Sequence, residues 1–419
     1  MKSTRLRSLT KTLIVGGAML GGVSAAVAQD ASRIEKLEQE NQNLRKRLEA
    51  LEAVAQKEGI MPGDKPGPKP VAAMSSMTVS GFVQASYFYN SNKPADRQGD
   101  GYLWNTTHNS FSLNKVKLTL ASPPVERSGE KWDAGYRVSL IWGEDASLVD
   151  TGLGVSGFGN IREAFVEMNV PIGTGLNVKA GQLISLLNWE SGDGGAANPN
   201  FSQGYQWFFT GNGPSAGVQL GYTLTDWLDV NLRVQNGLYA GAVDGNSAKT
   251  LIGSLNLKPA KGLWVNLLGF GGDETSTLTV RGGSALAGYD VTDQFHTGFE
   301  FDYFDFDRHG TSAAKLWSVG GWAWYDFTPK VGLALRAEYL DDKDGFGIKG
   351  VAFPGRPNSA IMSPDANGQV ESAALTLNWH PMPRIKIQPE VRYDHTSYSG
   401  GFDGKRDRVV FGAGATYLF

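Results

Sequence analysis

Apolar and polar positions alternate with a period of two through most of the chain after residue 76, most clearly at its C-terminal end. Within residues 408–419, every second residue from Val409 to Phe419 is apolar or aromatic, and the intervening positions are small or mixed. This pattern is typical of a strand that has lipid on one face and ends at the membrane interface, where aromatic rings prefer to sit. An ordinary edge strand of a soluble sheet is the alternative interpretation of this segment alone.

Turn signals divide the region after residue 76 into about sixteen alternating segments. Short turns are expected at 123–130, 171–175, 225–227, 259–262, 291–293, 328–330 and 381–383, and longer Gly-, Asn-, Asp- and Ser-rich loops at about 91–110, 144–159, 186–215, 237–248, 271–278, 307–313, 342–368 and 397–407. Short and long connections alternate in this way in bacterial outer-membrane barrels, which have an even number of strands. The weakest predicted strand is 278–289, without which the count would be odd.

A membrane location constrains the fold further. After residue 28 no apolar stretch approaches the length of a membrane-spanning helix. Only helices and closed barrels satisfy all of their backbone hydrogen bonds in lipid. We therefore predict an all-β fold, a transmembrane antiparallel β-barrel of about 16 strands over residues 77–419, surrounded by the lipid of the outer membrane of a Gram-negative-type bacterium.

The residues before the barrel divide into three segments. Residues 1–28 combine a basic start, an apolar stretch and an A-x-A site, which predicts a secretory signal peptide cleaved before Gln29. Residues 29–58 contain about three heptads with one polar core position, Asn41, and predict a short coiled-coil helix in the periplasm. A single solvated amphipathic helix is the alternative. Residues 59–76 are rich in Pro and Gly and predict an extended linker.

Charged residues occupy the inward positions of many predicted strands. Each would cost about 2–4 kcal/mol if it faced lipid near the bilayer midplane. A barrel of about sixteen strands is too wide for side chains to fill, so water must occupy its interior. We therefore predict a wet lumen whose pore-lining residues are Lys115, Lys117, Arg137, Glu163, Lys179, Arg233, Arg336, Glu338, Lys386, Glu390 and Arg392.

The longest predicted loop, 186–215, carries two acidic residues followed by a run of aromatic residues. Loops of this length in a compact domain are usually functional, so we expect this one to fold inward and narrow the pore, with Glu190 and Asp193 at the constriction. The bases expected opposite them are Lys115, Lys117, Arg137 and Lys179. Opposed charges at a constriction would favour polar solutes over apolar ones. Packing of the loop on a neighbour is the alternative.

Composition narrows the possible functions. The chain of 419 residues has no Cys and a formal net charge of −3, which does not favour nucleic acid as a partner. Neither a phosphate-binding loop nor a zinc-site spacing occurs. Asp394 and His395 are adjacent on a predicted strand, so they point to opposite faces and cannot act together. We expect no cofactor, no metal site and no enzyme activity.

Several stretches carry a resemblance to a known family. They are, in order, SGFVQASYFY (80–89), NSFSLNKVKLTL (109–120), GYRVSLIWGEDA (135–146), REAFVEMNVPIG (162–173), GLNVKAGQ (175–182) and NPNFSQ (198–203). Over most of residues 77–419 the chain resembles the OmpL-like β-barrel porins. A coiled coil before a barrel of this size is also similar to the phosphate-selective porins, which are trimers with a ladder of lumen arginines. Here acids such as Glu300 and Asp302 are interleaved with the inward bases.

The resemblance implies a function and an assembly. We expect an outer-membrane porin, a water-filled channel for passive diffusion of small hydrophilic solutes and ions. We also expect a homotrimer. The alternative is a structural outer-membrane anchor for the periplasmic coiled coil, with little transport.

Overall fold

A computed structural model gives the architecture of the chain. It describes residue 36 and residues 39–47, 76–102, 104–146, 159–240, 243–309, 313–342, 344 and 368–419. The chain divides into two units, 1–76 and 77–419, and each is described by itself.

In the N-terminal unit, residue 36 and residues 39–47 are helical, and the side chains of 39–47 are exposed. The predicted signal peptide, most of the predicted coiled coil and the linker lie outside the described residues. None of the described helices is both long and apolar enough to cross a membrane.

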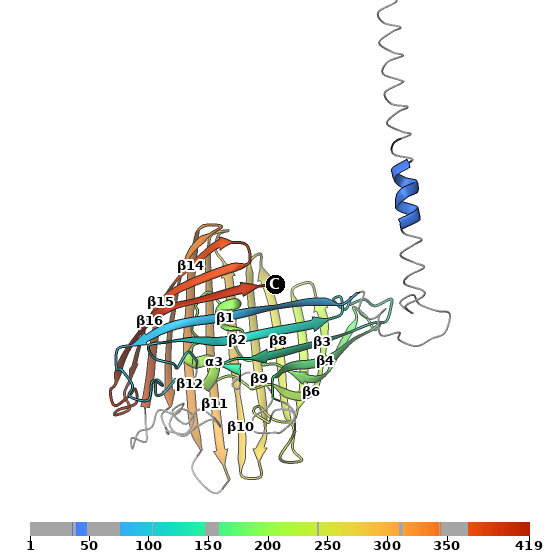
Figure 1. Cartoon of the computed structure of the whole chain (residues 1–419). Helices are drawn as coiled ribbons and strands as arrows, with labels where there is room; N and C mark the ends of the chain where they lie inside the picture. The colour runs from blue at the N-terminus through green and yellow to red at the C-terminus, as the bar shows by residue number, and fades with distance from the viewer. Residues whose placement is uncertain are drawn as a thin grey trace, which may run out of the picture. The chain divides into compact units, whose positions relative to one another are not determined.

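The second unit is a closed barrel of sixteen antiparallel strands, each paired with its neighbours in sequence (Figure 1). The strands are β1 (Thr78–Asn90), β2 (Ser110–Ala121), β3 (Asp133–Trp142), β4 (Ile161–Val170), β5 (Leu176–Leu183), β6 (Ser215–Thr225), β7 (Leu228–Gln235), β8 (Thr250–Ala260), β9 (Leu263–Thr275), β10 (Leu278–Asp290), β11 (Phe295–Arg308), β12 (Ala314–Thr328), β13 (Val331–Asp342), β14 (Gly368–Met382), β15 (Ile385–Thr396) and β16 (Asp407–Leu418). The predicted all-β barrel and its strand number are confirmed.

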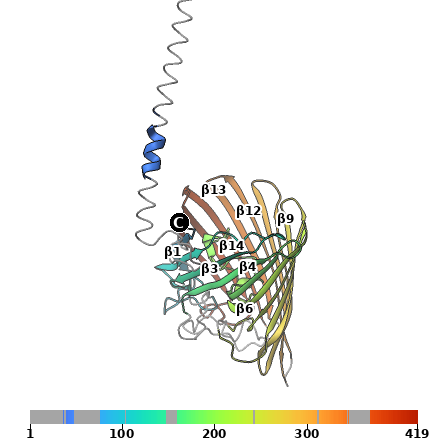
Figure 2. The ribbon, with the colours of Figure 1, turned by 90° about the vertical axis from the view of Figure 1, so that its right-hand side faces the viewer.

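The first and last strands close the barrel. β1 pairs antiparallel with β16, with Phe82 opposite Leu418. The last residue takes part, because the backbone N–H of Phe419 donates to the carbonyl of Gly81 and the N–H of Gly81 donates back to Phe419. Both ends of the barrel segment therefore lie at one rim, and the seven predicted short turns lie at that rim too, whereas the two-residue turn between β9 and β10 lies at the opposite rim. Seen from a perpendicular direction, the strands tilt together, as closure of a barrel requires (Figure 2).

Side chains alternate between the two faces as expected. On β15 the apolar Val391 and Tyr393 are exposed on the outer face, whereas Glu390, Arg392 and Asp394 are buried inside the barrel. Most of the other strands follow the same alternation, so an apolar outer surface surrounds an interior that is largely polar and includes one buried apolar cluster. This is the arrangement that lipid outside and polar groups inside demand.

One predicted loop is wrong. The Gly- and Asp-rich stretch 271–278 is not a loop, because β9 continues to Thr275 and β10 begins at Leu278. The two strands stay paired along this stretch, with Gly271 opposite Arg281. The weakest predicted strand, 278–289, is thus a regular strand, and pairing with two neighbours outweighs the poor strand preference of its glycines.

Candidate functional site

The segment between β5 and β6, residues 184–214, folds into the barrel and is called the inward loop below. It contains a short 3-10 helix, Gly194–Ala196, and the α-helix α3, Tyr205–Phe209, which contacts β12 and β13 (Figure 1). Most of the loop's side chains are buried. The loop therefore crosses the interior and packs against the opposite wall, β11–β16, called the far wall.

Carboxylates of the far wall bind the backbone of the inward loop. Glu338 on β13 accepts hydrogen bonds from the N–H groups of Tyr205 and Gln206, at 3.2 and 3.1 Å, at the start of α3. Glu390 on β15 accepts from the N–H of Phe201 at 2.8 Å. Buried backbone donors need partners, and in an irregular loop no strand ladder supplies them. These acids supply the missing acceptors.

Bases of the far wall bind the same loop through its acceptors. Lys386 on β15 donates to the carbonyls of Gly195 and Asn198, at 3.0 and 2.7 Å. Arg392 donates to the carbonyl of Gln203 at 2.8 Å. Acids and bases of this wall thus serve to hold the loop, and they are withdrawn from water.

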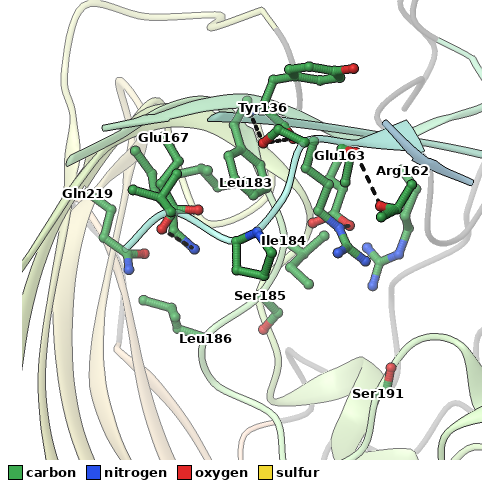
Figure 3. Close-up of a pocket in the computed structure, with 18 of the residues that line it drawn as sticks. Tyr136, Arg162, Glu163, Glu167, Leu183, Ile184, Ser185, Leu186, Ser191 and Gln219 are labelled. Carbon is green, nitrogen blue, oxygen red and sulfur yellow. Dashed lines mark hydrogen bonds and ion pairs between the residues drawn. The ribbon is translucent and has the colours of Figure 1, made fainter. Parts of the chain in front are cut away.

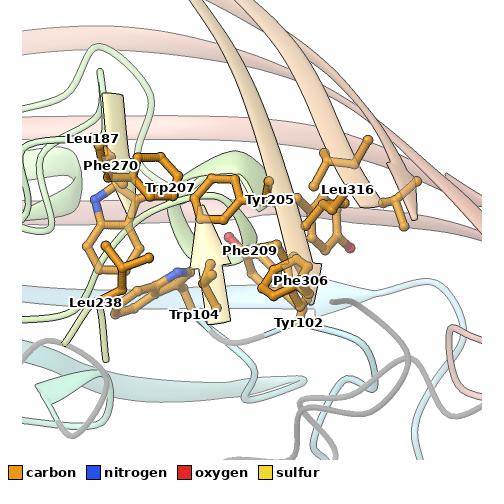
Figure 4. Packing of buried hydrophobic residues seen from close by; sticks show 14 of the residues in the cluster. Tyr102, Trp104, Leu187, Tyr205, Trp207, Phe209, Leu238, Phe270, Phe306 and Leu316 are labelled. Carbon is orange, nitrogen blue, oxygen red and sulfur yellow. The ribbon is translucent and has the colours of Figure 1, made fainter. Parts of the chain in front are cut away.

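Aromatic and apolar side chains fill the space around α3. Trp207 of the inward loop meets Trp104 of the loop 91–109 edge-on, with ring centroids 4.8 Å apart. Tyr205 lies beside Tyr102 from the same loop, with centroids 5.8 Å apart. The cluster labelled in Figure 4 also includes Leu187, Phe209, Leu238, Phe270, Phe306 and Leu316. The predicted inward loop therefore has an apolar anchor as well as polar ones.

Glycines on the strands make room for large side chains of the loop. A Cβ at Gly414 on β16 would overlap the ring of Phe201, and one at Gly298 on β11 would overlap Trp189. The absence of a side chain at each glycine leaves room for these rings next to the wall. The packing of the inward loop thus depends on the sequence of the strands as well as on that of the loop itself.

A cavity of about 750 Å³ remains between the inward loop and the wall formed by β2–β7, called the near wall (Figure 3). In Figure 3, Arg162 and Glu163 lie on one side, Glu167 and Gln219 lie on the other, and Ser191 belongs to the loop. Of the described residues that line it, five are bases (Lys117, Arg137, Arg162, Lys179 and Arg233) and three are acids (Glu163, Glu167 and Asp193). The cavity is a space in the barrel interior, lined by charged residues, that the inward loop leaves open.

Three ion pairs span or border this cavity. Lys117 on β2 and Asp193 at the tip of the loop are 2.6 Å apart, Arg137 and Glu163 are 2.6 Å apart, and Lys179 and Glu167 are 3.6 Å apart. Arg233 has amide and carbonyl partners, the side chain of Gln219 and the carbonyl of Ile184. Lys117 and Asp193 thus form a direct ion pair between the near wall and the inward loop at the border of the cavity.

The structure sorts the predicted pore residues into two groups. Those that border the cavity are Lys117, Arg137, Glu163, Lys179, Arg233 and Asp193. Those that are buried inside the barrel, away from this cavity, are Lys115, Glu190, Arg336, Glu338, Lys386, Glu390 and Arg392. The second group was expected to line open water and does not, because the inward loop covers the far wall and Lys115 pairs with Asp145 beside Trp104.

The expected position of Glu190 is therefore wrong. Its carboxylate does not face the near-wall bases but binds Arg336 of the far wall at 2.9 Å and the indole N–H of Trp322 at 3.2 Å. Asp193, three residues on, does face the near wall. A turn of the loop between the two residues sends their side chains to opposite walls.

Sequence reasoning missed Arg162 and Glu167. Strict alternation puts Arg162 on the outer face beside the inward Glu163, but the register shifts between Ser139 and Leu140 opposite them, and both Arg162 and Glu163 are buried. Such an irregularity leaves no periodic signal. Glu167 follows the inward alternation of Glu163 and could have been found from it.

Among the described residues, no group of three or more His, Asp or Glu side chains could hold a metal ion.

The family described as "Putative beta-barrel porin-2, OmpL-like" matches residues 76–419, which is most of the chain. The chain belongs to this family. No curated protein matches it.

Solved structures with a similar fold are outer-membrane porins and channels. OprB of Pseudomonas putida is 12% identical, with a TM-score of 0.56, and the match covers 83% of this chain and 95% of that one. The anion-selective porin of Comamonas acidovorans is 12% identical, with a TM-score of 0.55 and coverage of 82% and 99%. The channel DcaP of Acinetobacter baumannii is 17% identical, with a TM-score of 0.51 and coverage of 82% and 97%. At these identities the likeness shows the fold alone.

Family and fold together make this protein an outer-membrane channel rather than an enzyme. The resemblance inferred from the sequence stretches is confirmed.

Proposed function

We propose that this porin lets small hydrophilic solutes and ions diffuse passively along the near wall, between β2–β7 and the inward loop. The observation that carries the proposal is the open, charge-lined cavity that remains where the loop covers the rest of the interior. Its polar lining replaces part of a solute's hydration, and its volume of about 750 Å³ has room for small molecules. No cofactor is needed for such transport.

The test is conductance of the purified protein in a planar bilayer. The chain has no Cys, so a single introduced thiol can be modified selectively. We expect that a bulky thiol reagent lowers the conductance of Lys179→Cys, whose side chain borders the cavity. The matched control is Asp226→Cys, in the exposed turn between β6 and β7, whose modification should change nothing. A wild-type protein without measurable conductance would refute the proposal.

The alternative, a structural anchor with little transport, finds no support in the family or the fold. An anchor would need no open cavity lined by charges. The bilayer measurement also decides this point, because an anchor would not conduct.

We further propose that the protein is a homotrimer whose subunits meet through the near wall. β5 and β7 have 8 residues each, whereas β12 and β14 have 15. At about 3.3 Å per residue and a tilt of about 45°, eight residues rise only about 19 Å, less than the apolar band of about 25 Å. Exposed apolar side chains such as Val166 lie on this wall, and a second copy would cover them.

A pair of variants tests the trimer. Val166→Gln places a polar group on the near wall, and Leu335→Gln does the same on the outer face of β13 in the far wall. Native mass measurement in mild detergent should find trimers for the wild type and Leu335→Gln and a larger monomer fraction for Val166→Gln. A monomeric wild type would refute the assembly, and equal effects of both variants would place the interface elsewhere.

A further inference from the structure

We propose that the path prefers anions and that Arg137, Phe165 and Lys179 on the near wall form a subsite for small organic carboxylates. This inference rests on the proposed diffusion function and names the solute class. Two independent observations carry it: the distribution of charge between the two walls and the local geometry of these three residues.

The first observation is that the inward loop removes most of the interior acids from the path. Glu338, Glu390 and Glu300 accept hydrogen bonds from loop N–H groups, and Glu190 pairs with Arg336. The mixed charge along the strands is therefore not the charge that a solute meets. Among the described residues that line the cavity, Lys117, Arg137 and Lys179 pair with its three acids, whereas Arg233 binds the amide of Gln219 and the carbonyl of Ile184 and is left as an excess positive charge. A lumen with this excess lowers the energy of an anion relative to a cation.

The second observation is that Arg137 presents an open guanidinium to the cavity. Its Nε donates to Glu163 at 2.6 Å, and among the described residues its two terminal nitrogens have no hydrogen-bond partner. The side chain of Arg137 is 42% exposed, whereas that of Glu163 is 6% exposed and also accepts from Ser139. The buried Glu163 thus fixes the orientation of the Arg137 guanidinium through its Nε and leaves the two terminal nitrogens available. Terminal nitrogens held in this way offer the planar fork that binds a carboxylate with two parallel hydrogen bonds.

Phe165 and Lys179 complete the subsite. Phe165 is directly opposite Arg137 in the pairing of β3 with β4, and the ammonium of Lys179 lies 5.1 Å from the centre of its ring. Phe165 borders the cavity together with Leu183 and Leu186. The half-buried Phe165 ring thus lies beside the ammonium of Lys179, on a strand position directly opposite Arg137. It offers an apolar surface to the body of a solute whose carboxylate is held by the cations.

The charge preference is tested by reversal potentials of purified wild type in a potassium chloride gradient, which should show chloride favoured over potassium. Arg137→Gln should lower the chloride-to-potassium permeability ratio about twofold to threefold, because a unit charge about 8 Å away changes an ion's local concentration by that factor even in water. The control Lys330→Gln removes an exposed charge from the turn between β12 and β13 and should leave the ratio unchanged, because bulk salt screens it.

The carboxylate subsite is tested with benzoate and acetate under bi-ionic conditions. For wild type, the benzoate-to-acetate permeability ratio should exceed the ratio of the mobilities of the two ions in water. Phe165→Leu should abolish this excess and keep the chloride preference. Arg137→Lys should also keep the chloride preference but weaken the preference for both carboxylates over chloride, because an ammonium lacks the fork.

The outcomes separate the two proposals. A wild type that conducts but prefers potassium, or that shows no excess of benzoate, overturns this inference and leaves the diffusion function standing. A wild type that does not conduct overturns the diffusion function. An Arg137→Gln ratio equal to that of wild type also overturns the subsite, and the Arg137→Lys variant shows whether the protein tolerates a change at this position.

Discussion

The carboxylate of Glu190 and the guanidinium of Arg336 lie 2.9 Å apart inside the barrel, and both side chains are almost completely withdrawn from water. Glu190 belongs to the inward loop and Arg336 to β13. The same guanidinium donates to the hydroxyl of Ser202, and its Nε lies 3.2 Å from Glu338. One base thus joins two parts of the loop to the far wall. This relationship makes the path through the barrel depend on residues that no solute touches.

Arg336→Met should therefore destabilise the protein and loosen the loop. Removing the base leaves Glu190 and Glu338 buried without a counter-charge, which typically costs about 3–5 kcal/mol. We expect a lower unfolding temperature in detergent and noisier single-channel currents, because the loop then fluctuates into the path. Arg97→Met, at an exposed site in the loop 91–109, is the control. Equal unfolding temperatures for both variants would show that Arg336 does not hold the loop.

Gly414→Ala tests the packing of the inward loop against β16. The added methyl group would overlap the ring of Phe201, and displacing a packed ring costs about 1–3 kcal/mol. The control is Gly253→Ala on β8, where an added Cβ meets no atom within 4 Å. Thermal unfolding should separate the two variants. In the background Phe201→Ala the Gly414 substitution should cost much less, and a full cost there would assign the effect to the strand alone.

The barrel itself could be predicted from the sequence because the alternation that marks its strands involves only residues close together in the chain. Lipid outside and polar groups inside impose a period of two, and residues such as Val391 and Arg392 obey it. The strand at 278–290 is the weakest of those predicted because Gly-rich segments have weak strand preference, and pairing with β9 and β11 makes it regular. Most of the charges that alternation places inward are buried or border the cavity, whereas Arg162, which it places on the outer face, is buried as well.

Alternation cannot tell which inward charges border the cavity and which bind the inward loop. Lys386 and Lys117 have the same pattern on their strands, yet one binds loop carbonyls and the other borders the cavity. The difference is set by where a loop more than 150 residues away in sequence from Lys386 comes to rest, a tertiary property with no periodic signal. The opposite directions of Glu190 and Asp193 have the same origin.

Acidity should stabilise the contact between the loops 91–109 and 397–406. Burial, together with the charges of Asp403 and Asp96, raises the pKa of Asp100 to about 6 against the opposing effect of Arg408. The folded loop binds this proton more tightly than the unfolded chain does. The resulting contribution to the stability of the contact between the two loops is complete below about pH 4 and is lost as pH rises through about 6. It amounts to at most about 1 kcal/mol, because Asp100 is partly open to water.

Hydrogen exchange measures this effect at the amides of Gly99 and His108, which donate within the loop. After correction for the intrinsic rates, we expect slower exchange at pH 5 than at pH 7.5. Asp100→Asn should remove the difference and give slow exchange at both values. The same pH dependence in wild type and variant would mean that another group is responsible.

Neutralising Asp193 and Glu190 one at a time should affect two different properties, ion selectivity for Asp193 and stability for Glu190. Asp193→Asn leaves Lys117 without its acidic partner at the border of the cavity, so the chloride-to-potassium permeability ratio should rise about twofold to threefold. Glu190→Gln should leave this ratio unchanged but lower the unfolding temperature, because its charge is buried against Arg336 and away from the cavity. Asp226→Asn, in an exposed turn, should change neither quantity. If Glu190→Gln shifted the reversal potential as much as Asp193→Asn, the path would run along the far wall, and the division of the interior argued above would be wrong.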